Sequence, residues 1–317
     1  MLSEVNLFKA LPEGEVKVSE LAKALKVRDN ARILEVALRL QRKGCVRIRK
    51  PLFREHRILK IRSDCPRSKC KTIAVINLKG GVGKTITTVN LSACLAQAGH
   101  RTLIVDLDPQ ANATSVLGVE PKATVYGVLV GSVTVKDAVY NTKYPNLDLI
   151  PSELNLAGAE VELMGTEGVY RLKEVVDELK DTYRFIVVDC PPSLSLLSMN
   201  ALAAADSIIV PVQCDQFALK SIEKLMETMK LLAEVNKKLY VEGILITSYE
   251  AGNELCVETA KSIRETYGDI LYDTMINRDA TLSEASSHGT PIIHYRADSD
   301  SAKSYTRLSE GVASDGK

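Results

Sequence analysis

A glycine-rich segment, Lys79 to Thr85 (KGGVGKT), contains the residue types that bind a polyphosphate. Its glycines allow backbone N–H groups to turn toward an anion, Lys84 places a cation within reach of the outer phosphates, and the Thr85 hydroxyl is a ligand for Mg²⁺. A strand pattern, Lys71 to Asn77, precedes the segment and an apolar helical pattern follows it, so the positive end of the helix dipole faces the same anion. A chance glycine turn would lack these flanking elements. The order of strand, loop and helix predicts a site for a nucleoside triphosphate and Mg²⁺.

One position of the loop departs from the ordinary phosphate-loop pattern G-x-x-x-x-G-K-[ST], because Lys79 replaces its first glycine. In this the segment resembles the deviant Walker A box, K-G-G-x-G-K-T, of the ParA and MinD group of P-loop ATPases. The resemblance implies that the nucleotide is ATP and that two ATP-bound subunits form a homodimer. It also implies that Lys79 crosses the dimer interface and stabilises phosphate charge on the partner subunit's nucleotide.

Two strand-end segments extend the resemblance. Residues 101–114 (RTLIVDLDPQANAT) resemble the second motif of the group, which implies that Asp108 positions the attacking water and that Asp106 supports the magnesium shell. The alternative, that this pair of carboxylates caps the next helix, stays open. Residues 184–193 (RFIVVDCPPS) resemble the Walker B segment, in which Asp189 ends an apolar strand and holds Mg²⁺ through water.

The resemblance runs from about Lys71 to the C-terminus and favours ParA over MinD. Residues 208–215 and 282–292 match two further stretches of the group, and D-P-Q-x-N-A-T, D-C-P-P-S and L-S-E-A-x-S-H-G resemble partition ATPases of the ParA and Soj type closely. The C-terminal segment SYTRLSEGVASDGK has one Arg and one Lys, whereas MinD relatives end in a basic amphipathic helix that binds membranes. A MinD-like positioning ATPase is therefore the weaker alternative.

Two departures concern the nucleotide. Ile86 replaces the threonine that commonly follows the magnesium ligand, and Asn277-Arg278-Asp279 replaces the usual Pro-Arg-Asn near the adenine. The predicted catalytic residues are Lys79, Lys84 and Asp108, the predicted metal ligands are Thr85, Asp106 and Asp189, and the predicted nucleotide-binding residues are Lys79, Gly80, Gly81, Val82, Gly83, Lys84, Thr85, Ile86 and Arg278.

The charge of the chain is unevenly distributed. The net charge is only +1, but residues 1–63 hold 16 Lys and Arg against 7 Asp and Glu, which leaves 25 against 33 in the remaining residues. A small unit of charge +9 therefore precedes a larger one of charge −8. The asymmetry indicates a nucleic-acid contact near the N-terminus, although a solvated basic face has the same composition.

The N-terminal pattern predicts three helices and a hairpin, which resembles a winged helix-turn-helix domain. The expected helices cover 2–11, 19–27 and 31–43, and the expected strands cover 46–49 and 58–62. In that motif the third helix enters the major groove and the hairpin contacts the backbone. The alternatives are a small basic cap and a winged fold used for protein contacts. The predicted DNA-binding residues are Arg32, Arg39, Arg42, Lys43, Arg47 and Arg49.

A second DNA surface is weakened in this chain. Partition ATPases typically hold DNA through arginines at the positions of Thr281 and Gly252, and the acidic unit repels phosphates. DNA contact is therefore expected mainly from the N-terminal unit.

The composition is that of a soluble globular α/β protein. Hydrophobic residues make up 45% and aromatic residues only 5%, so the core consists mainly of Ala, Val, Ile and Leu. No apolar run is long enough to span a membrane, and the N-terminus lacks the features of a signal peptide, so we expect a cytoplasmic, nucleoid-associated protein without a membrane partner. Seven scattered cysteines without a C-x-x-C pair predict neither a disulfide framework nor a zinc site, and Cys190 and Cys214 are interpreted as structural.

Together these features predict a mostly parallel, twisted P-loop NTPase sheet flanked by helices, with a small winged helix-turn-helix domain in front. The expected boundaries are 1–63 for the winged domain, 64–71 for a linker and 72–317 for the ATPase domain. The predicted function is a dimerising, DNA-binding ATPase in plasmid or chromosome partition, and the resemblance implies a ParB-like centromere-binding protein as its partner. An ATP-gated transcription regulator is the alternative.

Overall fold

The chain divides into two compact units, residues 1–68 and 69–317. The computed structural model describes residues 15–24, 33, 37, 46–49, 57–60, 70–165, 167–231 and 235–314. The prediction that the linker reaches residue 71 is wrong for its last two residues. Cys70 is buried and Lys71 opens the first strand of the second unit, where it forms an ion pair with Glu242 at 2.6 Å.

The first unit contains a three-stranded antiparallel sheet in the order β1-β3-β2. Its elements are β1 (Glu15–Lys17), α2 (Val18–Ala24), β2 (Val46–Arg49) and β3 (Arg57–Lys60). The expected second helix and the two paired strands are present. Strand β1 was not predicted, because three residues are too few to show an alternating pattern. Ile33 and Ala37 are helical and buried.

The remaining predictions for this unit fall mostly outside the described residues. This applies to the first expected helix and to Arg32, Arg39, Arg42 and Lys43. Arg47 and Arg49 lie on β2. The winged helix-turn-helix motif therefore stays a prediction.

The second unit is built on a seven-stranded sheet in the order β10-β9-β4-β8-β5-β7-β6. Every neighbouring pair is parallel except β6 and β7. The strands are β4 (Lys71–Val75), β5 (Thr102–Asp106), β6 (Tyr140–Asn141), β7 (Leu147–Ile150), β8 (Phe185–Asp189), β9 (Ser207–Gln213) and β10 (Tyr240–Thr247). This confirms the predicted mostly parallel sheet of a P-loop NTPase.

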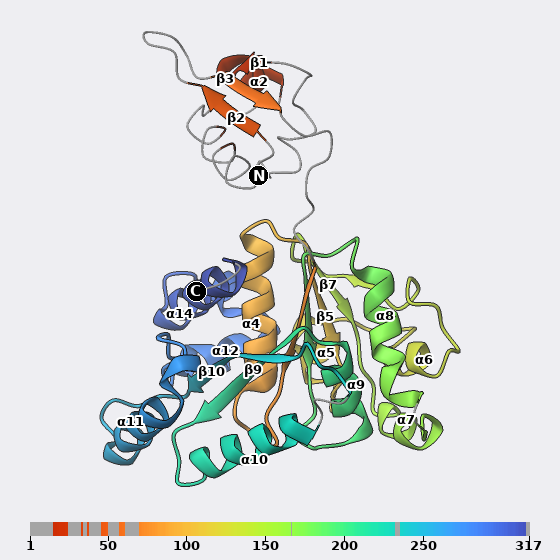
Figure 1. The fold of residues 1–317 in the computed structure, drawn as a ribbon, viewed down its shortest axis with the longest axis vertical. Coiled ribbons are helices and arrows are strands. Elements are labelled where there is room, and N and C mark those ends of the chain that lie inside the picture. Colours follow the sequence, from red (N-terminus) through yellow and green to blue (C-terminus); the bar gives the residue numbers. More distant parts are fainter. Residues whose placement is uncertain are drawn as a thin grey trace. The chain divides into compact units, whose positions relative to one another are not determined.

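Helices cover both faces of this sheet, as Figure 1 shows for α4 and α14 on one side and α8 and α9 on the other. The helices are α4 (Lys84–Gln97), α5 (Asn112–Leu117), α6 (Val125–Leu129), α7 (Leu156–Glu162), α8 (Arg171–Leu179), α9 (Leu196–Ala204), α10 (Ala218–Leu231), α11 (Glu254–Tyr267), α12 (Ala280–Ser287), α13 (Ile292–Tyr295) and α14 (Asp300–Ala313). Because both faces are covered, β5, β7 and β8 are buried along their whole length.

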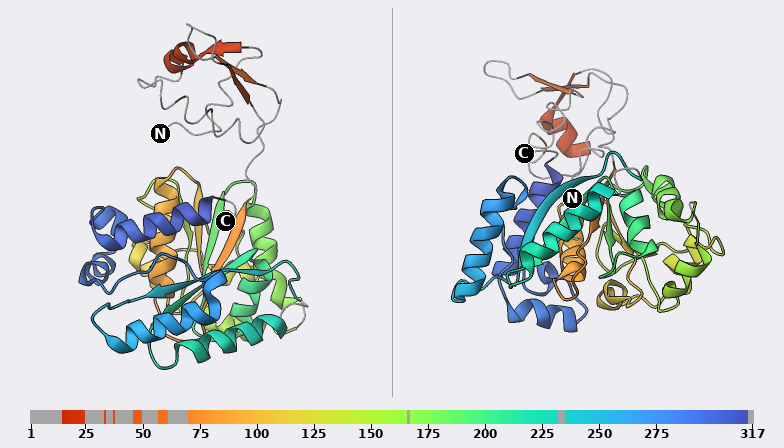
Figure 2. Two further views of the ribbon diagram at one scale, coloured as in Figure 1. Left: turned by 60° about the vertical axis from the view of Figure 1, so that its left-hand side comes forward. Right: turned by 60° about the horizontal axis from the view of Figure 1, so that its bottom comes forward.

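Helix α4 is the most deeply enclosed helix of the site. Eleven of its 14 residues are buried, between the sheet and α14. Toward the β10 edge, α10 and α11 lie side by side (Figure 2). Among the described residues, no helix is long and apolar enough to cross a membrane.

Candidate nucleotide site

The candidate site lies where the parallel strands end. Because β4, β5, β8, β9 and β10 run in the same direction, their carboxyl ends meet at one edge of the sheet, and Asp106 pairs in register with Asp189. The phosphate loop follows β4 at this edge and leads directly into α4. Ligands of open α/β sheets bind at this end of the strands.

Two glycines of the loop are required by its backbone. Gly81 has φ 75° and Gly83 has φ 84°, both in the left-handed region that side chains disfavour. A Cβ on Gly81 would meet nothing within 4 Å, and one on Gly83 would make only ordinary contact with Thr247 at 3.8 Å. The constraint is therefore conformational. Gly80 differs, since it has no positive φ and a Cβ there would lie 4.0 Å from Pro192.

Side chains from neighbouring strands hold the loop in place. The Gln213 amide donates to the Gly81 carbonyl at 2.8 Å, and the Thr247 hydroxyl donates to the Val82 carbonyl at 2.9 Å. These donors lie at the ends of β9 and β10, more than 130 residues from the loop. Neither residue was predicted to hold the loop, because no local pattern in the sequence distinguishes them.

Lys84 is built into the interior. It begins α4, is 7% exposed, and its Nζ donates to the carbonyl of Lys79 at 3.2 Å. Burial lowers the pKa of Lys84, while the nearby charges of Asp189 and Asp108 oppose that shift. A buried cation held by the loop's own backbone fits the predicted role of binding phosphate.

Lys79 lies at the other end of the loop, and its side chain is directed toward Asp215. Its backbone N–H donates to Asn77 Oδ1 at 3.0 Å, and its Nζ forms an ion pair with the carboxylate of Asp215, just after β9. About a third of each side chain is exposed. Burial opposes ionisation of Asp215, but hydrogen bonds from Lys79 and from the Phe217 N–H outweigh it and lower the pKa of Asp215. Lys79 thus contacts an acid of its own chain.

Asp189, at the end of β8, is fully buried. Its Oδ1 accepts a hydrogen bond from the Thr88 hydroxyl at 3.2 Å, whereas its buried Oδ2 has no partner among the described residues. Burial and the neighbouring charge of Asp106 raise the pKa of Asp189. A buried carboxylate oxygen without a donor costs free energy unless a cation or water satisfies it. This orphaned oxygen fits a magnesium site.

Asp106 and Asp108 are placed differently from each other. Asp106 is fully buried and accepts bonds from the Thr114 N–H at 2.8 Å, from the Thr114 hydroxyl at 2.7 Å and from the Asp108 N–H. Asp108 accepts from the Gln110 N–H at 3.0 Å, and its carbonyl accepts from the Ser152 hydroxyl at 2.7 Å.

The partners of Asp106 bear on its predicted role. They are the helix-capping contacts that the alternative interpretation describes, since Thr114 lies in α5. Burial raises the pKa of Asp106, and hydrogen bonds from Thr114 oppose the shift. The described contacts thus involve Asp106 in positioning the second motif, and its support of the magnesium shell stays a prediction.

The remaining predicted residues lie at the margin of the site. Ile86 packs in the first turn of α4 against the cluster beneath α14. Arg278 lies beyond the end of β10, where its N–H donates to the Tyr249 carbonyl at 2.9 Å and its guanidinium to Glu250 at 2.6 Å. Its side chain is 72% exposed, so a contact with adenine stays a prediction.

The residues present fit ATP and Mg²⁺ together. The loop would supply the backbone cradle, Lys84 the buried cation, and Thr85 and Asp189 the oxygens for a hard divalent ion. When bound, Mg²⁺ offsets the negative charge of the phosphates. ATP and Mg²⁺ are the cofactors of this site.

Known proteins are similar to this chain in sequence. A family described as an AAA domain matches residues 70–241. The chain is 45% identical over 251 residues to the sporulation initiation inhibitor protein Soj of Bacillus subtilis, covering 78% of this chain and 99% of Soj. It is 39% identical to the chromosome partitioning protein ParA of Caulobacter vibrioides, covering 77% of this chain and 94% of ParA.

A solved structure supports the nucleotide site. The septum site-determining protein MinD of Pyrococcus horikoshii, complexed with Mg-ADP, is 27% identical with a TM-score of 0.67, covering 77% of this chain and 96% of MinD. The relatives confirm the resemblance predicted from the phosphate loop and strand-end motifs. The chain belongs to the ParA and Soj family of chromosome-partitioning ATPases, and it hydrolyses ATP.

Proposed function

We propose that this ATPase acts as an ATP-dependent homodimer that binds DNA through its N-terminal units during the segregation of plasmid or chromosomal DNA. The observation that carries this proposal is the contrast within the phosphate loop. Lys84 is buried and bound to the loop, whereas Lys79 is partly exposed and held by Asp215. Among the described residues, the Lys79 ammonium has one ion-pair partner, Asp215, so it can exchange that partner for a phosphate of a second subunit.

The surface beside Lys79 suits close approach of a partner subunit. Gly80 has no side chain, and the nearest atom to a Cβ built there is Pro192 Cβ at 4.0 Å. A second backbone can therefore approach the loop at Gly80 without displacing a side chain. In the proposed dimer, Lys79 stabilises phosphate charge on the partner subunit's nucleotide, Asp108 positions the attacking water, and Asp106 supports the magnesium shell.

The N-terminal unit supplies the DNA contact in this proposal. Soj is covered over 99% of its length by 251 residues, so about a fifth of this chain has no counterpart in it, and the matching family begins at residue 70. The charge of +9 lies in residues 1–63. Two basic units brought together by ATP would bind one duplex with a raised effective concentration, which increases affinity by on the order of a hundredfold.

The partner and the cellular setting follow from the same proposal. Relatives are named for chromosome partitioning, so a ParB-like centromere-binding protein is the proposed partner and the nucleoid in the cytoplasm is the proposed location. A transcription regulator is the second candidate, because the basic unit is an addition that Soj lacks. Strong preference for one operator over random DNA would favour that candidate.

DNA binding by the full chain, with and without ATP, tests the division of labour. Arg39→Ala combined with Arg42→Ala should weaken binding to random duplex at least tenfold and reduce the slope of log affinity against log salt by about two. The matched control is Lys261→Ala combined with Arg264→Ala, which removes two exposed cations from α11. An equal or larger loss in the control would contradict the proposal.

A further inference from the structure

Ser152 connects the end of β7 to the turn that carries Asp108. It lies two positions after β7, which pairs in parallel with β5, so it reaches the edge of the sheet at which Asp108 follows β5. Ser152 is buried, with an exposed fraction of 2%. Its hydroxyl donates to the Asp108 carbonyl at 2.7 Å, across 44 positions of the chain. Ser152 is therefore a tertiary contact of the Asp108 turn and not a part of it.

The turn from Asp108 to Ala111 has a strained backbone. The Ala111 N–H donates to the Asp108 carbonyl at 2.9 Å, which closes the turn. Ala111 has φ 52° and ψ 35°, in the left-handed region that residues with a Cβ disfavour and that glycine adopts readily. Such a conformation persists only where surrounding contacts hold it. The Ser152 hydroxyl supplies a contact of this kind, because it binds the same Asp108 carbonyl.

The orientation of the Asp108 carboxylate depends on this backbone. Asp108 Oδ1 accepts from the Gln110 N–H at 3.0 Å, a hydrogen bond within the same turn. Among the described residues, no side chain of another element donates a hydrogen bond to this carboxylate. The carboxylate therefore moves with the turn.

The backbone of Ser152 forms a second, separate contact. Its N–H donates to the Thr114 hydroxyl at 2.9 Å, and that hydroxyl donates to Asp106 Oδ2 at 2.7 Å. Alanine at position 152 keeps the N–H and loses only the hydroxyl. One substitution can thus release the Asp108 carbonyl while the contacts of Asp106 are retained.

We propose that Ser152 is a positioning residue for ATP hydrolysis, whose hydroxyl holds the strained turn in the conformation from which Asp108 acts. Without the hydroxyl, Ala111 leaves the left-handed region in a fraction of the molecules, and the Asp108 carboxylate is displaced in that fraction. Ser152 has no hydrogen bond to the phosphate loop among the described residues, so ATP affinity should be retained. The inference rests on the proposed role of Asp108 in hydrolysis.

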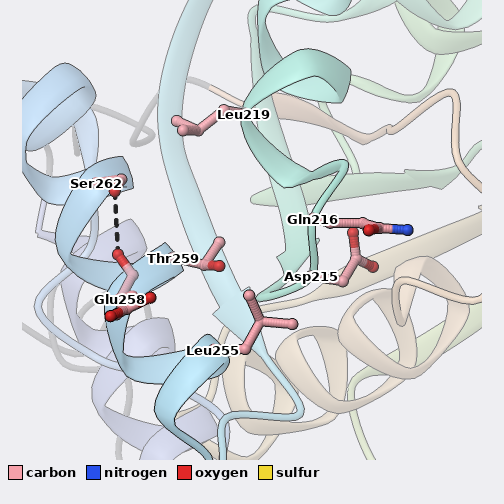
Figure 3. Close-up of a pocket in the computed structure, with 7 residues that line it drawn as sticks. All are labelled: Asp215, Gln216, Leu219, Leu255, Glu258, Thr259 and Ser262. Carbon is pink, nitrogen blue, oxygen red and sulfur yellow. Dashed lines mark hydrogen bonds between the residues drawn. The ribbon is translucent and has the colours of Figure 1, made fainter.

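Steady-state kinetics of the full-length chain test the effect on the reaction. Ser152→Ala should lower kcat about tenfold, the effect of one buried hydrogen bond, while the KM for ATP changes less than about twofold. Ser152→Cys, which keeps a weaker donor, should have an intermediate kcat. The matched control is Ser262→Ala on α11, where the Ser262 hydroxyl donates to the Glu258 carbonyl at 3.0 Å beside a cavity of about 180 Å³ (Figure 3). The control should keep the parent kcat.

Hydrogen exchange measures the turn in the absence of nucleotide. In Ser152→Ala, the peptide that contains the Gln110 and Ala111 amides should exchange about tenfold faster, whereas the peptide from β8 should exchange as in the parent. Ala111→Gly removes the penalty of the left-handed conformation, so its addition to Ser152→Ala should raise kcat again by about fivefold. A glycine in this turn would not rescue the loss of a contact that only stabilises the fold.

Parallel assays of Asp108→Ala separate failure of the inference from failure of the proposed Asp108 role. A parent kcat in Ser152→Ala, with Asp108→Ala inactive, would overturn the inference and leave the role of Asp108 intact. Parent activity in Asp108→Ala would refute that role itself. Unchanged exchange of the turn in Ser152→Ala, or a loss of kcat that Ala111→Gly does not restore, would show that Ser152 does not position Asp108.

Discussion

The two lysines of the phosphate loop lie only five residues apart, yet they occupy opposite environments. Lys84 is 7% exposed and donates to a loop carbonyl, while burial lowers its pKa. Lys79 is about one third exposed and bound by a single surface ion pair to Asp215. The comparison shows that Lys84, at one end of the loop, is buried in the protein interior. Lys79, at the other end, is held by an ion pair whose disruption costs little free energy.

This difference follows from what surrounds each end. The Lys84 end is enclosed by α4 and braced by Thr247 and Gln213, which bond to loop carbonyls. Exposed ion pairs such as that of Lys79 contribute only about 0 to 1 kcal/mol, because solvent screens them. Substitutions at the two ends of the loop are therefore expected to have unlike consequences.

The largest effect is expected for Lys84→Ala. Removal of the buried cation should abolish ATP binding, whereas Lys79→Ala should leave most of the affinity and lose the hydrolysis that depends on dimerisation. Equilibrium binding of a fluorescent ATP analogue and steady-state ATPase assays measure the two quantities. Equal losses of affinity in both variants would show that the two ends do not differ.

A smaller effect is expected for Thr247→Val, which has nearly the same shape. The substitution removes the hydroxyl that donates to Val82 at 2.9 Å and to Val212 at 3.2 Å. Loss of these buried bonds should lower the free energy of unfolding by about 1–2 kcal/mol. Thermal unfolding checks this, with the exposed Thr266→Val on α11 as the control. If Thr247→Val and Thr266→Val lower the free energy of unfolding equally, the hydrogen bonds of the Thr247 hydroxyl contribute little to stability.

The smallest effect is expected for Asp215→Asn, which weakens the bond that holds Lys79. Dimer-dependent ATPase activity should reach half its maximum at a lower protein concentration, by up to about fivefold for each of the two pairs in a dimer, because such a pair is worth at most about 1 kcal/mol. Asp273→Asn is the control, since it breaks the exposed pair with Arg264. A rise in the required concentration would contradict the account.

The pH dependence of this variant is also defined. Because the pKa of Asp215 is lowered in the folded chain, its stabilising charge is present above the ordinary aspartate pKa of about 3.9 and is lost only as the pH falls through the lowered value. The ratio of Asp215→Asn to parent activity should therefore stay constant between pH 6 and 8. A ratio that changes in this window would indicate another titrating group.

Much of the second unit could be predicted from sequence because its signals are local. The buried strand before the loop, the glycines and the aspartates at strand ends each lie within a short segment, and the sheet places Asp106 and Asp189 in register. The predicted strand, Lys71 to Asn77, was two residues longer than β4. Buried parallel strands read as continuous apolar runs, so their ends are poorly marked.

The contacts that the sequence missed join distant segments. Asp215 lies 136 residues from Lys79, and Thr247 lies 165 residues from Val82. β1 was missed because three residues cannot establish an alternating pattern. Such contacts depend on topology and not on spacing.

The most direct test of the central claim mixes two inactive variants. Lys79→Ala lacks the lysine that is proposed to cross the interface, and Asp108→Ala lacks the carboxylate that is proposed to act in its own subunit. In an equal mixture half of the dimers combine both chains, and each holds one complete site, so about a quarter of the parent ATPase activity should return. If the mixture stays inactive while labelled subunits show that mixed dimers form, Lys79 acts within its own subunit and the account is wrong.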